Sequence, residues 1–291
     1  MNSPDNITVS VAKNLAQSLR SHMIILSWII FSCVVIVSRG IDARTIILGL
    51  IFFIAMYGIV VLQNDLSDSE TDKLNKRYDI PYSQGHLSQK QLTYTILLLS
   101  IIVSFTGFIL SYHILPWAGL YILLGYLYSG PANVKSRGAA AALLLGFCYG
   151  AMPWLIGASI TGQLYEPGLL TMSLISFIFS SGIIVIKDFK DIAGDKATNK
   201  NTLLVMKGAT YTRRYYLLMT SAAYVAIVIY CQLNNNLLLA ICGTGLAGLN
   251  YWLLASKEIL QSSHARSSRG KWSRVLFFSY ALAVYLIDVL F

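Results

Sequence analysis

Long apolar runs, separated by short polar segments, make up most of the chain. A run of about 20 mostly apolar residues is long enough for a helix to cross a bilayer. Nine such runs occur, at residues 22–38, 45–63, 92–113, 114–131, 139–162, 168–186, 215–232, 236–255 and 273–291. The third and fourth runs almost merge, and we separate them at Pro116. The pattern predicts an all-α, polytopic membrane bundle of nine transmembrane helices.

The composition is typical of a protein that lies in lipid. Hydrophobic residues make up 56% of the chain and charged residues only 12%, whereas charged residues are about a quarter of a soluble domain. No Pro/Ser-rich or low-complexity stretch resembles a linker, so we expect a single domain over residues 1–291. The four cysteines stand singly in apolar runs, which favours small buried residues over a disulfide or zinc site. The polar first twenty residues lack the apolar core of a cleavable signal peptide.

Basic residues fall almost entirely on one side of the predicted bundle. With nine spans, the N-terminus and the loops after spans two, four, six and eight share a side, and all 22 Lys and Arg except Arg39 and Arg44 lie there. Such a bias marks the cytoplasmic side of a membrane protein. We therefore expect the N-terminus to be cytoplasmic. The net charge of +9 is explained by this topology and by anionic lipid headgroups, so it does not indicate nucleic-acid binding.

Carboxylates gather in two short segments on that same side. Eight of the 13 acidic residues are in these segments: Asp65, Asp68, Glu70, Asp72 and Asp79 after span two, and Asp188, Asp191 and Asp195 after span six. In each segment three aspartates follow the spacing i, i+3, i+7, which places them on one face if the helix continues past the membrane. Both segments are expected to be cytoplasmic.

Three carboxylates on one helical face repel one another and are costly beside a bilayer, unless a cation binds them. Magnesium prefers hard oxygen ligands and usually binds through a few carboxylates together with phosphate oxygens and water. Two such faces would hold magnesium around one diphosphate, and the interleaved lysines and arginines would complement its charge. The alternative is that these are ordinary solvated charges at a membrane edge. Two motifs of identical spacing on one side favour the metal.

These segments resemble a known family. NDLSDSETD (64–72) is similar to the NDxxDxxxD motif of the UbiA superfamily of intramembrane prenyltransferases, and DFKDIAGD (188–195) is similar to its second motif. YSGPANVKSRG (128–138) resembles the family's YSxP…K segment, and TLLVMKG (202–208) the sequence that follows the second motif. LLGFCYGAMPWLIG (144–157) is similar to the chlorophyll-synthase-like branch.

The resemblance implies a UbiA-type helical bundle around a cavity, with Mg²⁺ and diphosphate at its cytoplasmic end. It implies Mg²⁺-dependent transfer of a prenyl group from a prenyl diphosphate to an aromatic or lipid-like acceptor within the membrane, with release of pyrophosphate. The residues implied as catalytic are Asp65, Asp68, Asp188 and Asp191. The metal ligands implied are these four with Asn64, Asp72 and Asp195, and the diphosphate contacts implied are Arg77, Tyr128, Lys135 and Lys196.

The sequence also departs from the family. An Arg-Pro pair often follows the first motif, whereas here the region reads NKRYDIPYSQG (75–85). Two interpretations are open: Arg77 replaces the missing arginine from a different register, or the acceptor side of the pocket differs from that of the family.

Two alternative functions remain open at this stage. A UbiA-type terpene cyclase would share the same magnesium and diphosphate site, and the lipophilic acceptor, whether aromatic or lipid-like, is not readable from the residues. A cation-coupled transporter would instead place acidic residues near the centres of spans. Here the carboxylates cluster at the ends of spans, and Asp288 alone lies well inside one.

Overall fold

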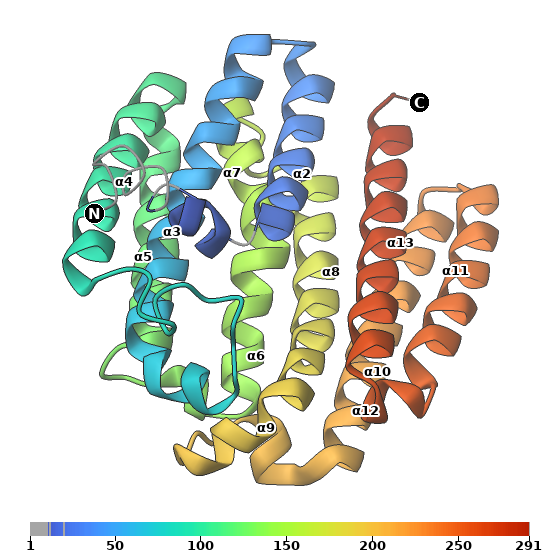
Figure 1. Ribbon diagram of the computed structural model, residues 1–291. Coiled ribbons are helices and arrows are strands. Elements are labelled where there is room, and N and C mark those ends of the chain that lie inside the picture. The colour runs from blue at the N-terminus through green and yellow to red at the C-terminus, as the bar shows by residue number, and fades with distance from the viewer. Residues whose placement is uncertain (1–10, 12, 20, 291) are drawn as a thin grey trace. The chain divides into compact units, whose positions relative to one another are not determined.

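A computed structural model describes residues 11, 13–19 and 21–290 (Figure 1). This part of the chain is helical and contains no strand, which confirms the predicted all-α class. The predicted cytoplasmic N-terminus, at residues 1–10, lies outside the described residues. So does Phe291, the end of the last predicted span.

The helices follow the predicted apolar runs. In the described part of the chain, seven helical stretches are long and apolar enough to cross a membrane. They are α3 (Ala43–Leu74), α4 (Gln89–Leu110), α6 to α7 (Ala139–Thr161), α8 to α9 (Pro167–Ala197), α10 (Leu203–Leu233), α11 (Leu237–Ala255) and α13 (Ser263–Leu290). The other two runs form α2 (Ser21–Arg39), whose shorter apolar part is Ile24–Arg39, and the 15-residue helix α5 (Leu115–Ser129). A count of nine membrane-crossing helices stays a prediction.

The chain divides into two compact units, each described here by itself. Unit 1 comprises residues 1–29, 42–134 and 193–200, and unit 2 comprises residues 30–41, 135–192 and 201–291. The division falls within α2 and within α9 (Asp188–Ala197), so each of these helices contributes residues to both units. The single domain over residues 1–291 stays a prediction.

In unit 1, α3 packs against both α4 and α5. Small residues permit this close approach: a Cβ on Gly125 of α5 would lie 2.5 Å from the Val60 side chain of α3. A buried hydrogen bond of 2.6 Å joins the Ser27 and Tyr57 hydroxyls, and the Tyr57 ring packs against that of Tyr121 at 4.8 Å. These contacts fix α3, the helix that carries the first motif.

In unit 2, α6 (Ala139–Gly146) and α7 (Met152–Thr161) are joined by a π-helical turn at Phe147–Ala151 and pack against α8 (Pro167–Ile183). Pro153 has no N–H for a carbonyl of the preceding turn, and the wider π turn accommodates this loss. A Cβ on Gly150 would lie 2.3 Å from the Ser176 carbonyl oxygen of α8. Trp154 then donates its indole N–H to the Ser176 hydroxyl at 3.0 Å.

The remaining helices of unit 2 pack through aromatic rings. Phe179 of α8 stacks on Phe277 of α13 with ring centroids 3.8 Å apart, and Tyr224 of α10 meets Phe277 edge-on at 5.4 Å. The three side chains are fully buried. Inside α10, Gly208 adopts φ +77° and kinks the helix, a conformation that glycine tolerates best.

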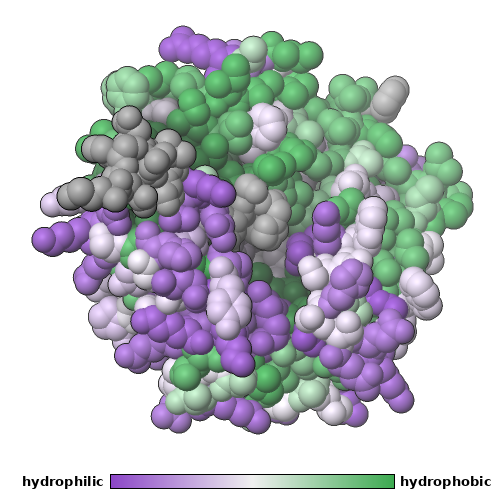
Figure 2. Space-filling view, in the orientation of Figure 1, coloured by the Kyte–Doolittle hydropathy of each residue, from purple (hydrophilic) through white to green (hydrophobic). Residues whose placement is uncertain are grey.

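The spans expose apolar side chains on their outer faces. On α4 these include Leu97, Ile101, Phe105 and Phe108, all more than half exposed. Figure 2 shows such hydrophobic side chains as green surface areas beside areas of hydrophilic side chains. Exposed apolar faces of this extent fit contact with lipid.

Candidate active site

The first motif lies on the last turns of α3. This helix has 32 residues, so it is about 48 Å long, whereas the hydrocarbon core of a bilayer is about 30 Å thick. The helix is therefore longer than the hydrocarbon core, as the predicted position of the motif beyond the membrane requires. Asp65, Asp68 and Asp72 are all buried, which confirms that the three carboxylates share the packed face of the helix.

The second motif lies on α9, which follows α8 through a 3₁₀ turn at Ile184–Lys187. All three of its aspartates are on this one short helix, as their spacing predicts. Asp195 is buried, while Asp188 and Asp191 are half-buried. Asp195 belongs to unit 1, together with the first motif, and the other two belong to unit 2.

Within unit 1, the end of α3 is joined to the end of α9 by side-chain hydrogen bonds. The Gly194 backbone N–H donates to the Asn75 side-chain oxygen at 2.7 Å. The Thr71 hydroxyl donates to the Thr198 hydroxyl at 3.2 Å, and Thr198 donates to the Gly194 carbonyl at 2.8 Å. A Cβ on Gly194 would lie 2.5 Å from the Asn75 side-chain amide, so any larger residue here would have to displace that amide. The two motifs, far apart in the sequence, are thereby brought together at Asp68, Asp72 and Asp195.

Lys200 forms ion pairs with both motifs. Its Nζ lies 3.7 Å from Asp68 Oδ2 and 3.5 Å from Asp195 Oδ1. From the sequence, Lys196 was expected to contact the diphosphate, and nothing indicated a role for Lys200. Lys196 is exposed on α9, whereas Lys200 is half-buried. The sequence signal was weak, because Lys200 lies beyond the motif and is brought back by the turn at Asn199, where φ is +53°.

Asn64 links the first motif to the YSGP segment. The Ser129 hydroxyl donates to the Asn64 side-chain oxygen at 3.1 Å, and this oxygen is also the atom by which an asparagine would bind a metal. Tyr128, the preceding residue, is buried at the end of α5. The sequence analysis named Asn64 and Tyr128 but not Ser129, the residue that joins the two segments.

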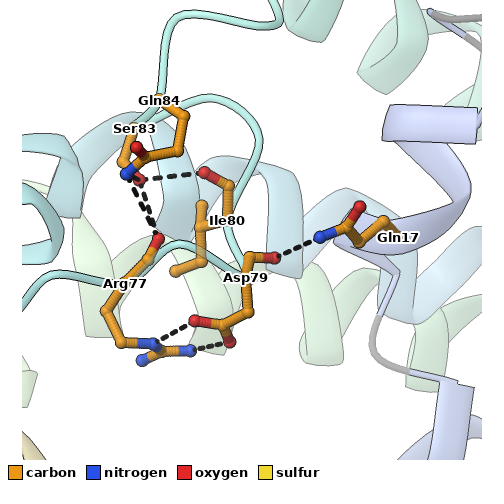
Figure 3. A network of polar contacts seen from close by, with 6 residues as sticks. All are labelled: Gln17, Arg77, Asp79, Ile80, Ser83 and Gln84. Atoms are coloured by element: carbon orange, nitrogen blue, oxygen red, sulfur yellow. Dashed lines mark hydrogen bonds and ion pairs between the residues drawn. The ribbon is translucent and has the colours of Figure 1, made fainter.

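Arg77 is held by its neighbour in the loop after α3. Figure 3 shows its guanidinium paired with Asp79 through two hydrogen bonds, each 2.7 Å long. The Arg77 backbone carbonyl in turn accepts a hydrogen bond from the Ser83 hydroxyl at 3.3 Å, and the Asp79 carbonyl accepts one from Gln17 at 3.3 Å. Asp79 is largely exposed, while Arg77 is mostly covered. This bidentate pair gives the loop a fixed arrangement.

In unit 2, Lys135 lies in a short 3₁₀ turn at Val134–Ser136 and is buried. The turn is followed by Gly138, whose N–H donates to the Asn201 carbonyl at 3.1 Å. Gly138 has φ +55°, and a Cβ there would lie 3.1 Å from Met206. The segment carrying Lys135 is thus attached to the segment that follows the second motif, which the sequence did not indicate.

Arg266 supports the start of α9 in unit 2. Its guanidinium lies 6.0 Å from the centre of the Phe189 ring and donates to the carbonyls of Ile259 and Leu260 at 2.8 and 3.2 Å. It also interacts electrostatically with Asp191. In the sequence, Arg266 stood out only as one of the basic residues on one side of the predicted bundle. It lies in the first turns of α13, and its position next to the second motif depends on the short helix α12 (Glu258–Gln261), which carries the two carbonyls.

The carboxylates where the two motifs meet suit a magnesium ion. Among the described residues, no three His, Cys, Asp or Glu side chains converge to form a complete metal site. Mg²⁺ usually binds through one or two carboxylates and completes its shell with phosphate oxygens and water. A buried pair of carboxylate donors at Asp68 and Asp195, with aspartates on either side in each motif, therefore fits a magnesium ion that is shared with a phosphate ligand.

Comparison with known proteins agrees with this site. The profile of the UbiA prenyltransferase family matches residues 25–281. Chloroplastic chlorophyll synthase of Arabidopsis thaliana is 29% identical over 157 residues, which cover 50% of this chain and 39% of that protein. Digeranylgeranylglyceryl phosphate synthase of Thermococcus sibiricus is 26% identical over 260 residues, 84% of each chain.

A similar fold occurs among solved structures. A UbiA homolog from Archaeoglobus fulgidus, solved bound to GPP and Mg²⁺, has a TM-score of 0.69 and 16% identity, over 94% of this chain and 99% of that one. The matching region accounts for only about two fifths of the Arabidopsis chlorophyll synthase. Since the family profile matches most of the chain, this protein belongs to the UbiA prenyltransferase family.

Proposed function

We propose that this protein catalyses the Mg²⁺-dependent transfer of a prenyl group from a prenyl diphosphate to a lipophilic acceptor in the membrane, with release of pyrophosphate. The observation that carries the proposal is the meeting of Asp68 and Asp195, one from each aspartate-rich motif, around a single ammonium in unit 1. Membership of the UbiA prenyltransferase family supports it. So does the A. fulgidus homologue, which was solved with GPP and Mg²⁺.

The aspartates would hold the metal. We assign Asp65, Asp68, Asp188 and Asp191 as the principal ligands, directly or through water, with Asn64, Asp72 and Asp195 completing the coordination. Bound Mg²⁺ supplies positive charge to the diphosphate as the allylic C–O bond breaks. The carboxylates orient the metal from rigid helices, which keeps the site pre-organised.

Basic and hydroxyl groups would bind the diphosphate. We assign Lys135, Arg77 and Lys196 to its oxygens, where their charge offsets the negative charge of the leaving group. The Tyr128 hydroxyl is suited to donate a further hydrogen bond. For Arg77 this role requires the guanidinium to share or release Asp79, to which it is paired.

The apolar spans would receive the isoprenoid chain and exclude water from the allylic cation, so that the acceptor captures it. The relatives indicate acceptors of two kinds. Chlorophyll synthase and digeranylgeranylglyceryl phosphate synthase are both similar to this chain, and both names denote lipophilic products. We propose a lipophilic acceptor and do not choose between the acceptors of these two enzymes.

The sidedness of the site follows from the charge pattern. We propose that both aspartate-rich motifs face the cytoplasm, because they lie on the side of the predicted bundle that carries all of the Lys and Arg except Arg39 and Arg44. Arg39 and Arg44, on the connection between α2 and α3, would then face the opposite side.

The test is pyrophosphate release by the full chain, purified in detergent, with prenyl diphosphates of increasing length and Mg²⁺. We expect activity that EDTA abolishes and added Mg²⁺ restores. Asp68→Asn and Asp195→Asn should each lower the rate of pyrophosphate release. The expected decrease is larger than the roughly 10- to 100-fold that follows the loss of a residue that only hydrogen-bonds a metal ligand. Glu70→Gln is the matched control, since Glu70 is an exposed acid of the same motif, and it should retain activity.

The products distinguish transfer from cyclisation. Mass spectrometry in the presence of a membrane-lipid extract should show the prenyl group on an acceptor. A rearranged hydrocarbon or alcohol formed without acceptor would favour the cyclase instead. No pyrophosphate from any donor, with or without the extract, would contradict the proposal altogether.

A further inference from the structure

The turn after the second motif directs Lys200 back to that motif. The Lys200 backbone N–H donates to the Asp195 carbonyl at 2.8 Å, and Asn199 before it adopts φ +53°. This geometry brings the Lys200 side chain to the carboxylate of its own motif and, at the same time, to Asp68 of the other. All of these residues belong to unit 1.

The carboxylates that Lys200 joins are covered by protein. Asp195 is 1% exposed and Asp68 is 7% exposed. Two like charges that are removed from water repel one another and lose hydration, so both changes oppose bringing the motifs together. The ammonium offsets this cost in part, because one positive charge is shared between two negative ones.

A magnesium ion held at this site would draw on the same two carboxylates. Magnesium binds carboxylate oxygens at about 2.0–2.1 Å, whereas the Lys200 ammonium lies 3.5 Å from Asp195 Oδ1 and 3.7 Å from Asp68 Oδ2. A metal held by Asp68 and Asp195 would therefore be close to the ammonium, and the two cations would repel. Each cation would therefore bind this pair of carboxylates more weakly in the presence of the other.

We propose that Lys200 is a built-in competitor of the metal, which keeps Mg²⁺ affinity low until a diphosphate arrives. It holds the two motifs together before the metal binds and gives up its carboxylates when the metal does. The diphosphate brings negative charge that offsets the repulsion between the two cations, so metal and diphosphate strengthen each other's binding. This inference rests on the proposed function and adds Lys200 to it as a positioning residue.

Other contacts allow Lys200 to be changed without separating the motifs. The Asn75–Gly194 and Thr71–Thr198 hydrogen bonds join the same two helix ends and do not involve it. A variant at Lys200 therefore alters the charge at the carboxylates while these bonds keep α9 attached to α3.

The experiment measures Mn²⁺ binding to the full chain in detergent, by the loss of the free Mn²⁺ EPR signal, with and without inorganic pyrophosphate. Lys200→Met should bind Mn²⁺ alone about fivefold or more tightly than wild type does, and pyrophosphate should then increase its affinity less. Lys200→Arg should behave like wild type, because it keeps the charge. Lys73→Met is the control for a general loss of charge, since Lys73 is exposed one residue after Asp72.

The outcomes separate the inference from the proposed function. If wild type binds Mn²⁺ and Lys200→Met binds it no more tightly, the role of Lys200 is wrong and the metal site stands. The role is equally wrong if Lys73→Met increases affinity as much as Lys200→Met does. If neither wild type nor Lys200→Met binds Mn²⁺ with or without pyrophosphate, the proposed metal function fails and the inference fails with it.

Discussion

The Asn75 side chain accepts the backbone N–H of Gly194 at 2.7 Å. This single hydrogen bond joins the residue that ends α3 to the last turn of α9, and so connects the two aspartate-rich helices. A side chain at position 194 would have to displace the Asn75 amide, because Asn75 side-chain atoms lie 2.5–2.6 Å from where a Cβ would be.

Gly194→Ala should therefore displace the Asn75 amide and break the hydrogen bond that joins α9 to α3. We expect an overpacking cost of about 1–3 kcal/mol, seen as a lower melting temperature in detergent, together with weaker Mn²⁺ binding. Gly119→Ala is the control, since nothing lies within 4 Å of a Cβ at this position in α5. A Gly194→Ala protein as stable and as able to bind metal as Gly119→Ala would contradict the importance of this contact.

Gly150 has the same role between two spans of unit 2. A Cβ at this position would lie 2.3 Å from the Ser176 carbonyl, a backbone atom that cannot rotate away. Gly150→Ala should thus lower the melting temperature, with a cost again of about 1–3 kcal/mol. Gly245→Ala on α11, where a Cβ meets nothing within 4 Å, should not. Equal melting temperatures for the two variants would show that the helices separate without cost.

Arg266→Leu should destabilise the start of the second motif. Leucine replaces the aliphatic part of the arginine side chain but has no guanidinium. The variant therefore loses the hydrogen bonds to Ile259 and Leu260 and the cation–π contact with the Phe189 ring. Arg266→Lys should rescue it poorly, because an ammonium lacks the planar, forked donors of a guanidinium. Limited proteolysis of α12 and of the start of α9 is the measurement, with exposed Lys271→Leu as the control. Full protection in Arg266→Leu would argue against the supporting role.

The sidedness of α3 can be tested with single cysteines in a variant without the four native ones. Ala43 and Glu70 are exposed near opposite ends of this helix. A membrane-impermeant maleimide should label Ala43→Cys from outside intact cells and Glu70→Cys only in inverted vesicles. The reverse pattern would overturn the cytoplasmic assignment, and labelling of both from one side would show that α3 does not cross the bilayer.

The parts of the fold that depend on local pattern were predictable from the sequence. The apolar runs marked the helices, and the i, i+3, i+7 spacing placed Asp65, Asp68 and Asp72 on one buried face. Lys200 and Asn75 were not predictable in this way, because their roles depend on contacts between segments far apart in the chain. The sequence pattern also did not indicate that Asn199 adopts a left-handed conformation, with φ +53°, which turns the chain so that Lys200 returns to the motif.

The π turn at Phe147–Ala151 has a consequence for the register of unit 2. A π turn contains one residue more than an α turn of the same helix. The wider turn therefore absorbs one residue without rotating α7. If Phe147–Ala151 were a regular α-helix with the same residues, everything after it would rotate by about 100°, and Trp154 would leave Ser176, to which it now donates its indole N–H. The π turn thus sets which face of α7 meets α8, so deleting one residue within this turn should be tolerated better than deleting one elsewhere in α6 or α7.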